Sequence, residues 1–359
     1  MAQRALAIAQ VAPLHEAVPP KLYGGTERVV SYLTEALVAM GHDVTLFATG
    51  DSETGARLVP VVPSALRLTG AADPIAAHVL LLEQVATRAA DFDVIHFHCD
   101  YLHFPISRRL DASTLTTLHG RLDIPELVPL YREFTDAPLV SISNAQRAPL
   151  PWACWMATIY HGLPAETGTL RERPGDYLAV LGRISPEKGV DRAIEIARRA
   201  GMDLRIAAKV DDADRAYFEA VIRPLLDEPG IEYIGEIGEE DKDAFLGEAH
   251  ALLFPVDWPE PFGLVMIEAM ARGTPVIGYR RGSVPEVVDD GVTGCLVDSV
   301  DEAVRALESV RTMSRAGVRA RFDERFTSWR MAREYVDVYR RLSAPSPHWS
   351  LPCEPASSA

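Results

Sequence analysis

The sequence contains few cysteines and no long apolar run. Its four cysteines lack both metal-ligand spacing and disulfide-framework spacing, which favours a reducing compartment; they are Cys99, Cys154, Cys295 and Cys353. The N-terminal segment 1–11 carries one arginine, and its apolar run is too short for a signal peptide. No stretch approaches the roughly 20 apolar residues of a membrane-spanning helix. We therefore expect a cytoplasmic protein without membrane association.

Positive charge is in deficit throughout the chain. There are 36 Lys and Arg against 51 Asp and Glu, a formal net charge of -15. Residues 1–164 repeat this imbalance, with 11 basic against 16 acidic side chains. Nucleic acid and anionic membrane surfaces are therefore not expected as partners. By contrast, a hydrophobic content of 48% over 359 residues is sufficient for about two globular domains, each with its own core.

Short apolar runs of strand length alternate with amphipathic stretches of helix length, a pattern typical of parallel α/β architecture. In the first half we expect strands at 5–11, 43–48, 93–98, 113–119 and 138–143, and helices at 26–40, 75–90 and 125–134. In the second half we expect strands at 177–182, 204–208, 231–234, 251–254 and 275–279, and helices at 190–200, 213–226, 241–248 and 264–272.

The alternation restarts after segment 163–176, which is rich in Pro, Gly, Glu and Arg and reads as a linker. The fold class that we predict is α/β, with two Rossmann-like doubly wound domains, 1–164 and 172–327, facing an interdomain cleft. Ligands of such sheets bind at the carboxyl ends of the strands. The loops that follow strands are therefore where functional residues are expected.

The C-terminal region divides into a helix and a tail. Helix 328–342 presents Trp329, Tyr335 and Tyr339 at helical spacing, a pattern that favours core packing. The tail, 345–359, is mostly Ser, Pro and Ala, so we expect it to be disordered.

The most informative stretch is 256–273, in which a buried strand is followed by two prolines and a helix that Gly273 should end. Glu260 and Glu268 bracket the turn with seven residues between them. Eight helical steps would separate them by about 12 Å, comparable to the reach of a nucleotide sugar. Glu268 shares its helix face with apolar residues, so it needs donors, and a ribose diol offers two. The alternative is an exposed Glu268 paired with Arg272.

Two further segments could hold phosphate. Gly24 and Gly25 precede a helix, where the backbone can approach a ligand closely, although the dinucleotide pattern G-x-G-x-x-G is incomplete. Arg183 and Lys188 flank a predicted helix start at Ser185. A cation in a first helical turn opposes the helix dipole, and a bound diphosphate would remove that conflict. The alternatives are a flexible loop and two solvated surface cations.

Histidines lie in two of the predicted strands of the first half. His119 ends one strand beside a glycine, whereas His96 and His98 share one face of another. With His103 and Asp100 they could suggest a metal site, but the spacing does not support a closed one, so we expect no metal. We expect His96 and His98 to line an acceptor side of the cleft. For a lone histidine such as His119, a structural role is the alternative.

These motifs resemble those of retaining glycosyltransferases of family 4, which have the GT-B fold. The matching features are the glutamate pair, the glycine pair, the segment 182–189 (G-R-x-x-x-x-K-G) and the segment 116–120 (T-T-L-H-G). The resemblance covers most of the chain. It implies that 172–327 binds the nucleotide-sugar donor, that 1–164 forms the acceptor side, and that helix 328–342 packs back on the first domain.

The resemblance also implies roles for individual residues. Arg183 and Lys188 would stabilise the departing diphosphate, His119 would contact the transferred sugar, and Glu268 would bind the ribose. The remaining implied positions hold the sugar hydroxyls or the diphosphate, largely through backbone N–H groups; they are Glu260, Phe262, Gly263, Leu264, Gly24 and Gly25.

The implied activity is hexosyl transfer from a nucleotide-diphosphate sugar to a hydroxyl of a sugar, glycan or other small molecule. The resemblance favours UDP-sugars, with GDP-mannose as the other possibility, and implies a front-face mechanism with retention and no metal or other cofactor. Two alternatives remain open. One is a sugar-nucleotide epimerase or phosphorylase of the same fold, and the other is a non-catalytic nucleotide-sugar-binding protein.

Overall fold

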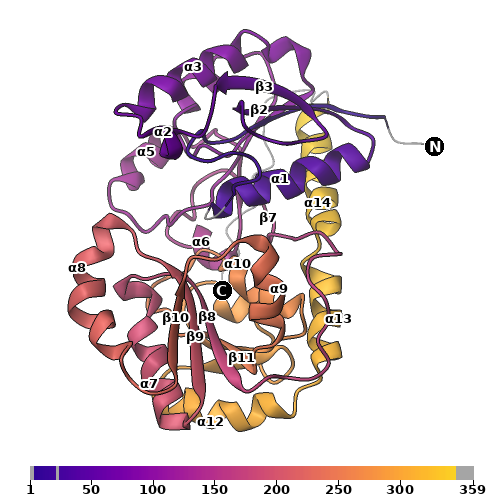
Figure 1. Cartoon of the computed structure of the whole chain (residues 1–359). Helices are drawn as coiled ribbons and strands as arrows, with labels where there is room; N and C mark the ends of the chain where they lie inside the picture. The colour runs from indigo at the N-terminus through magenta and orange to yellow at the C-terminus, as the bar shows by residue number, and fades with distance from the viewer. Residues whose placement is uncertain (1–3, 22–23, 345–359) are drawn as a thin grey trace. The chain divides into compact units, whose positions relative to one another are not determined.

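The computed structural model describes residues 4–21 and 24–344. The chain divides into two compact units (Figure 1). Unit 1 consists of Met1–Gly162 and Ser328–Ala359, and unit 2 consists of Leu163–Thr327. Each unit is built on one parallel sheet with helices, so the predicted α/β class is confirmed.

Unit 1 contains a seven-stranded sheet in the order β3-β2-β1-β4-β5-β6-β7, and every neighbouring pair is parallel. Its strands are β1 (Ala7–Val11), β2 (Asp43–Thr49), β3 (Arg57–Val62), β4 (Val94–Phe97), β5 (Thr114–Thr117), β6 (Leu139–Ser141) and β7 (Trp155–Thr158). Its helices are α1 (Gly25–Ala39), α2 (Leu66–Thr69), α3 (Pro74–Ala86), η1 (Ala89–Asp91), α4 (Phe104–Ser107), α5 (Leu127–Glu133), α6 (Asn144–Arg147) and α14 (Ser328–Ser343).

The strands of unit 1 that the sequence did not predict, β3 and β7, are the two edges of the sheet. β3 contains Pro60, which removes a ladder donor and is tolerated only at an edge or a bulge, and the register with β2 shifts beside it. The central strands are buried on both faces and therefore read as continuous apolar runs, which made them recognisable.

Helix α14 belongs to unit 1 although it ends the described chain. Arg330 donates to the backbone oxygen of Tyr160 at 2.6 Å, and the Ser343 hydroxyl donates to that of Asp93 at 3.1 Å. Tyr335 and Tyr339 are buried, as their spacing predicted. Trp329 is 50% exposed, so the expectation that it packs in the core is wrong.

Unit 2 contains a six-stranded parallel sheet in the order β10-β9-β8-β11-β12-β13. Its strands are β8 (Tyr177–Arg183), β9 (Asp203–Lys209), β10 (Ile231–Gly235), β11 (Ala251–Phe254), β12 (Val276–Tyr279) and β13 (Gly294–Val297). Its helices are η2 (Pro186–Lys188), α7 (Val190–Ala200), η3 (Asp212–Asp214), α8 (Arg215–Tyr217), η4 (Phe218–Ile222), η5 (Arg223–Leu225), α9 (Glu239–Gly247), α10 (Leu264–Met270), α11 (Val284–Val287), α12 (Val300–Arg311) and α13 (Arg315–Arg325).

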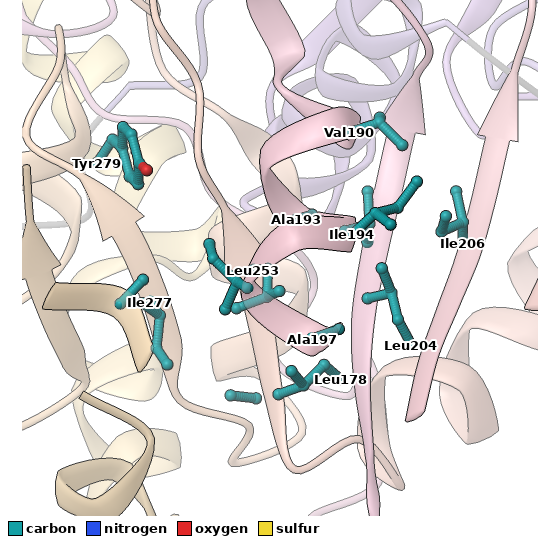
Figure 2. Packing of buried hydrophobic residues seen from close by; sticks show 14 of the residues in the cluster. Leu178, Val190, Ala193, Ile194, Ala197, Leu204, Ile206, Leu253, Ile277 and Tyr279 are labelled. Atoms are coloured by element: carbon teal, nitrogen blue, oxygen red, sulfur yellow. The ribbon is translucent and has the colours of Figure 1, made fainter. Parts of the chain in front are cut away.

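Helix α7 shows how the core of unit 2 forms. Figure 2 shows Val190 and Ile194 of its apolar stripe beside Leu204 and Ile206 of β9, in one buried cluster. The helix expected at 213–226 is instead broken into 3-10, α and π segments. Pro224 lies at the start of the last of these, where it cannot donate to a helical hydrogen bond.

Three remaining sequence expectations concern the cysteines, membrane spans and the tail. Cys99 and Cys295 are free thiols, whereas Cys154 is disulfide-bonded, which the spacing of the cysteines did not predict. Among the described residues, no helix is both long enough and apolar enough to cross a bilayer. The tail 345–359, expected to be disordered, lies outside the described residues.

Candidate active site

Three loops converge at one edge of the sheet of unit 2. They follow β8, β11 and β12, which are neighbours in a parallel sheet, so their carboxyl ends share that edge. The Asp257 backbone N–H donates to the Glu187 oxygen at 2.8 Å and joins the first two loops. The Ser283 N–H donates to the Glu260 oxygen at 2.9 Å and joins the second loop to the third.

Glu260 lies at the centre of these loops. Its side chain is buried, and its Oε2 accepts hydrogen bonds from Lys188 Nζ at 2.5 Å and from Trp258 Nε1 at 2.8 Å. Its backbone is held by Gly282, which has a φ of +52°. A Cβ at Gly282 would lie 2.3 Å from the Glu260 nitrogen and 2.4 Å from its oxygen. The loop geometry therefore requires glycine at this position.

Lys188 reaches Glu260 because the chain does not enter α7 directly. Pro186–Lys188 form one 3-10 turn, and Gly189, with a φ of +68°, then starts the helix. The expectation that Ser185 caps the helix and puts Lys188 in its first turn is therefore wrong. Lys188 precedes the helix, and its Nζ lies 4.9 Å from the centre of the Trp258 ring, within cation–π range.

Arg183 ends β8 among acidic side chains. Its guanidinium lies 2.6 Å from a carboxylate oxygen of Glu187, 3.6 Å from one of Asp214 and 3.7 Å from one of Asp211. A diphosphate that contacts Arg183 competes with these carboxylates for its guanidinium.

Glu268 is buried on α10, so the alternative of an exposed side chain is excluded. Its carboxylate is 2.9 Å from Lys242 Nζ of α9. Arg272 donates instead to the Glu268 backbone oxygen at 2.8 Å, and its Nε lies 3.3 Å from Asp243. Because α10 begins only at Leu264, the eight continuous helical steps expected between the two glutamates do not exist.

The segment between the glutamates packs closely. Gly263 has a φ of +78°, and a Cβ there would lie 2.8 Å from Met266 Cε. Phe262 is buried against Phe326, with ring centroids 6.3 Å apart, and its backbone oxygen accepts from the Ser283 hydroxyl at 3.0 Å. Leu264 then opens α10. The roles expected for Phe262, Gly263 and Leu264 in donor binding stay predictions.

In unit 1 the glycine pair lies at the start of α1. A Cβ at Gly24 would lie 2.7 Å from the Pro20 Cβ, so the close packing of this loop excludes a side chain. Gly25 is the first residue of α1 and is exposed. Residues 22–23, the preceding part of the loop, lie outside the described residues.

Three histidines of unit 1 form one group, His96 within β4 and His98 and His119 in the loops that follow β4 and β5. His98 Nδ1 lies 2.9 Å from His119 Nε2. His96 is fully buried, and its two ring nitrogens contact the Tyr339 hydroxyl at 2.7 Å and the Thr117 hydroxyl at 2.8 Å. Both nitrogens are thus used inside the unit, which argues against His96 lining an acceptor side.

Burial controls the charge state of these imidazoles. Desolvation lowers the pKa of His119 to about 3, and it lowers those of His96 and His98 well below the ordinary value of 6.5. Neighbouring histidines add a smaller effect in the same direction on His96 and His98. These three rings are therefore neutral near pH 7. Among residues 4–21 and 24–344, no group of three or more His, Cys, Asp or Glu side chains is arranged to hold a metal ion.

Sequence reasoning missed two residues that shape the site of unit 2, namely Lys242 and Trp258. Trp258 lies within the stretch singled out above, but a tryptophan between an aspartate and a proline gives no sign of its hydrogen-bond partner. Lys242 is 26 residues from Glu268 and is the only basic residue of α9, a weak signal at best.

Two family models match the chain in succession. The model described as Glycosyltransferase Family 4 matches residues 23–158, and that described as Glycosyl transferases group 1 matches residues 169–328. O-antigen chain mannosyltransferase C of Escherichia coli is 24% identical over 366 residues, which cover 90% of this chain and 96% of that protein. The match with the first two curated relatives covers about half of the length of each, 45% of one and 54% of the other.

Solved structures agree with the family models. AviGT4, a glycosyltransferase involved in avilamycin A biosynthesis, is 27% identical with a TM-score of 0.74, covering 95% of this chain and 99% of that one. Anabaena Alr3699/HepE, in complex with UDP and glucose, is 16% identical with a TM-score of 0.70 and covers 92% and 98% respectively, which shows a shared fold. With both halves matched, the chain belongs to the group 1 and family 4 glycosyltransferases and has the GT-B fold.

Proposed function

We propose that this glycosyltransferase moves a hexose from a nucleotide-diphosphate sugar to a hydroxyl acceptor, with retention of configuration and without a metal. We favour a UDP-sugar as donor, with GDP-mannose as the alternative. The presence of UDP and glucose in a structure of the same fold, and a mannosyltransferase among the relatives, support these two candidates respectively.

The observation that carries the proposal is the state of the two glutamates of unit 2. Both are buried, and each carboxylate is held by a lysine from another segment, Glu260 by Lys188 and Glu268 by Lys242. Burying an ion pair costs desolvation free energy that well-packed apolar residues would avoid. Two such pairs beside the ligand-binding edge of a parallel sheet are therefore better explained by ligand binding than by stability.

We infer an exchange of partners at Lys188. A diphosphate that binds Lys188 Nζ takes the place of the Glu260 carboxylate, which then accepts hydrogen bonds from the hydroxyls of the donor sugar. Glu260 stays oriented during the exchange because Trp258 donates to the same oxygen and Gly282 packs against its backbone. Glu268 accepts from the ribose hydroxyls in the same way.

The chemical step then needs positioning and charge stabilisation, not a protein nucleophile. The acceptor hydroxyl attacks from the face that the diphosphate leaves, and a phosphate oxygen takes its proton. Lys188, with Arg183 once its carboxylates are displaced, neutralises the leaving group. His119 stabilises positive charge that develops on the sugar, as the family resemblance implies.

Thermal unfolding in the presence of UDP, GDP and ADP tests nucleotide choice. A nucleotide at 100 times its Kd stabilises the protein by about 2.7 kcal/mol. Donor hydrolysis with sugars of the preferred nucleotide, repeated with a chelator, then identifies the sugar and tests metal independence. The anomeric configuration of the transfer product, read by NMR, tests retention.

Two variants separate the roles of the glutamates. Glu268→Ala should weaken nucleotide binding, whereas Glu260→Ala should lose turnover more than nucleotide affinity. Equal losses of nucleotide affinity would contradict these roles. Nucleotide binding without turnover for any donor and acceptor would favour the non-catalytic alternative, and interconversion of sugar nucleotides without an acceptor would favour an epimerase.

A further inference from the structure

A chain of hydrogen bonds crosses the interior of unit 1 from His119 to helix α14. Its links, with atoms 2.7 to 3.0 Å apart, join His119 to His98, His98 to Gln10, Gln10 to Tyr339, Tyr339 to His96, His96 to Thr117 and Thr117 to Tyr335. Every member other than His119 is buried. The two tyrosines come from α14 and meet partners 218 to 329 residues away in the sequence.

The amide of Gln10 sets the direction of this chain, because an amide oxygen only accepts and an amide nitrogen only donates. Its oxygen lies 2.8 Å from His98 Nε2, so His98 carries its proton on Nε2. Because the His98 ring is neutral, its Nδ1 is an acceptor. His119 Nε2, 2.9 Å from that Nδ1, must therefore be the donor.

The other half of the chain begins at the Gln10 amide nitrogen, which donates to the Tyr339 hydroxyl at 3.0 Å. That hydroxyl lies 2.7 Å from His96 Nδ1, and His96 Nε2 lies 2.8 Å from the Thr117 hydroxyl. Because hydroxyl groups both donate and accept, the amide fixes the directions only from His119 to Tyr339. In that stretch, reversal of one link would set two donors or two acceptors against each other, so the links support one another.

We propose that Gln10, His98 and Tyr339 are positioning residues that hold His119 with its proton on Nε2 and its Nδ1 as an acceptor for a substrate hydroxyl. His119 Nδ1 is a buried atom without a hydrogen-bond partner among the described residues. Buried polar atoms are rarely left unsatisfied, and a ligand hydroxyl is a donor that this acceptor fits. The hydroxyl is that of a sugar, a step that rests on the proposed function.

The tautomer can be measured without any substrate. In histidine-labelled protein, long-range 15N–1H correlation spectra distinguish a protonated ring nitrogen from an unprotonated one. We expect a single Nε2–H tautomer for His119 and for His98. In Tyr339→Phe the Gln10 amide loses its acceptor and can turn over, so the His119 nitrogen shifts should move toward a mixture of tautomers.

Tyr335→Phe is the matched control, because it removes a buried hydroxyl from the same helix at the far end of the chain. It should leave the His119 shifts unchanged. An Nδ1–H tautomer in the parent protein, unchanged shifts in Tyr339→Phe, or equal shifts in both variants would each overturn the positioning role. If Tyr339→Phe does not fold, Gln10→Met interrupts the neighbouring link and is read in the same way.

Activity then tests the link to catalysis separately. Tyr339→Phe should lower kcat between roughly tenfold and a hundredfold, as for a misplaced catalytic group, with the nucleotide Kd unchanged. Tyr335→Phe should stay within about twofold of the parent, as expected of a change outside the positioning links. A changed tautomer with an unchanged kcat would overturn the role of His119 toward the sugar and leave the positioning role intact. A lost kcat with an unchanged tautomer would overturn the positioning role.

Discussion

Mild acid should destabilise unit 1, because its interior holds imidazoles that are neutral when folded. Desolvation lowers the pKa of both His103 and His119 to about 3, against 6.5 for an ordinary histidine. Between these values the unfolded chain binds more protons than the folded one, so the free energy of unfolding falls as the pH is lowered. The stability is complete above pH 6.5 and is lost progressively below it.

The magnitude follows from the two pKa values. Between pH 7 and pH 5, one such histidine lowers the free energy of unfolding by about 2 kcal/mol, and the two together by about 4 kcal/mol. Desolvation raises the pKa of Glu27 and Asp100, and these carboxyl groups offset part of the loss. Because whole domains are stable by only about 5 to 15 kcal/mol, the effect is measurable.

His103→Gln provides the measurement. The ring of His103 contacts the Ser107 hydroxyl at 2.7 Å and the Thr116 hydroxyl at 3.0 Å, and it stacks on Phe97. The variant loses these contacts at every pH, but it also loses one titrating group. Urea unfolding measures the free energy of unfolding at pH 7 and at pH 5. The decrease between these two pH values should be about 2 kcal/mol smaller in His103→Gln than in the parent.

Ser107→Ala is the control for this experiment, because it removes the hydrogen bond to the His103 ring and keeps the ring. Its stability should be lower at both pH values, with a pH dependence close to that of the parent. If His103→Gln loses as much stability as the parent between pH 7 and pH 5, the neutral buried state assigned to His103 is wrong.

Two further changes test the site of unit 2. Gly282→Ala should lower the stability of the protein by about 1 to 3 kcal/mol through the clash with the Glu260 backbone, and it should reduce transfer. Gly291→Ala is the control, because Gly291 has a φ of +76° and an added Cβ would meet nothing within 4 Å, so this variant should carry only the backbone penalty. Equal effects of the two variants in urea unfolding would contradict the clash. Lys242→Met should destabilise the protein by about 3 to 5 kcal/mol, because Glu268 is left with a buried, unpaired charge. Adding Glu268→Gln to this variant should restore part of the lost stability. Additive losses in the double variant would show that the two side chains do not interact.

The central architecture could be predicted from the sequence because it depends on local spacing. Buried strands such as β8 and β11 read as short apolar runs, and α7 was placed at its observed bounds because its apolar residues recur with the helical period. Edge strands such as β3 have one neighbour and partly exposed faces, so their sequences carry no comparable signal.

The motifs likewise placed Glu260, Glu268 and Lys188 in loops and helices near strand ends, because motif spacing is local. Which atoms meet was decided only by the tertiary structure. Lys188 and Glu260 are 72 residues apart, and Gln10 and Tyr339 are 329 residues apart, yet each pair is hydrogen-bonded. The neutral state of His119 depends on burial by residues remote in the chain, and periodicity, which describes neighbours along the sequence, contains no information about such contacts.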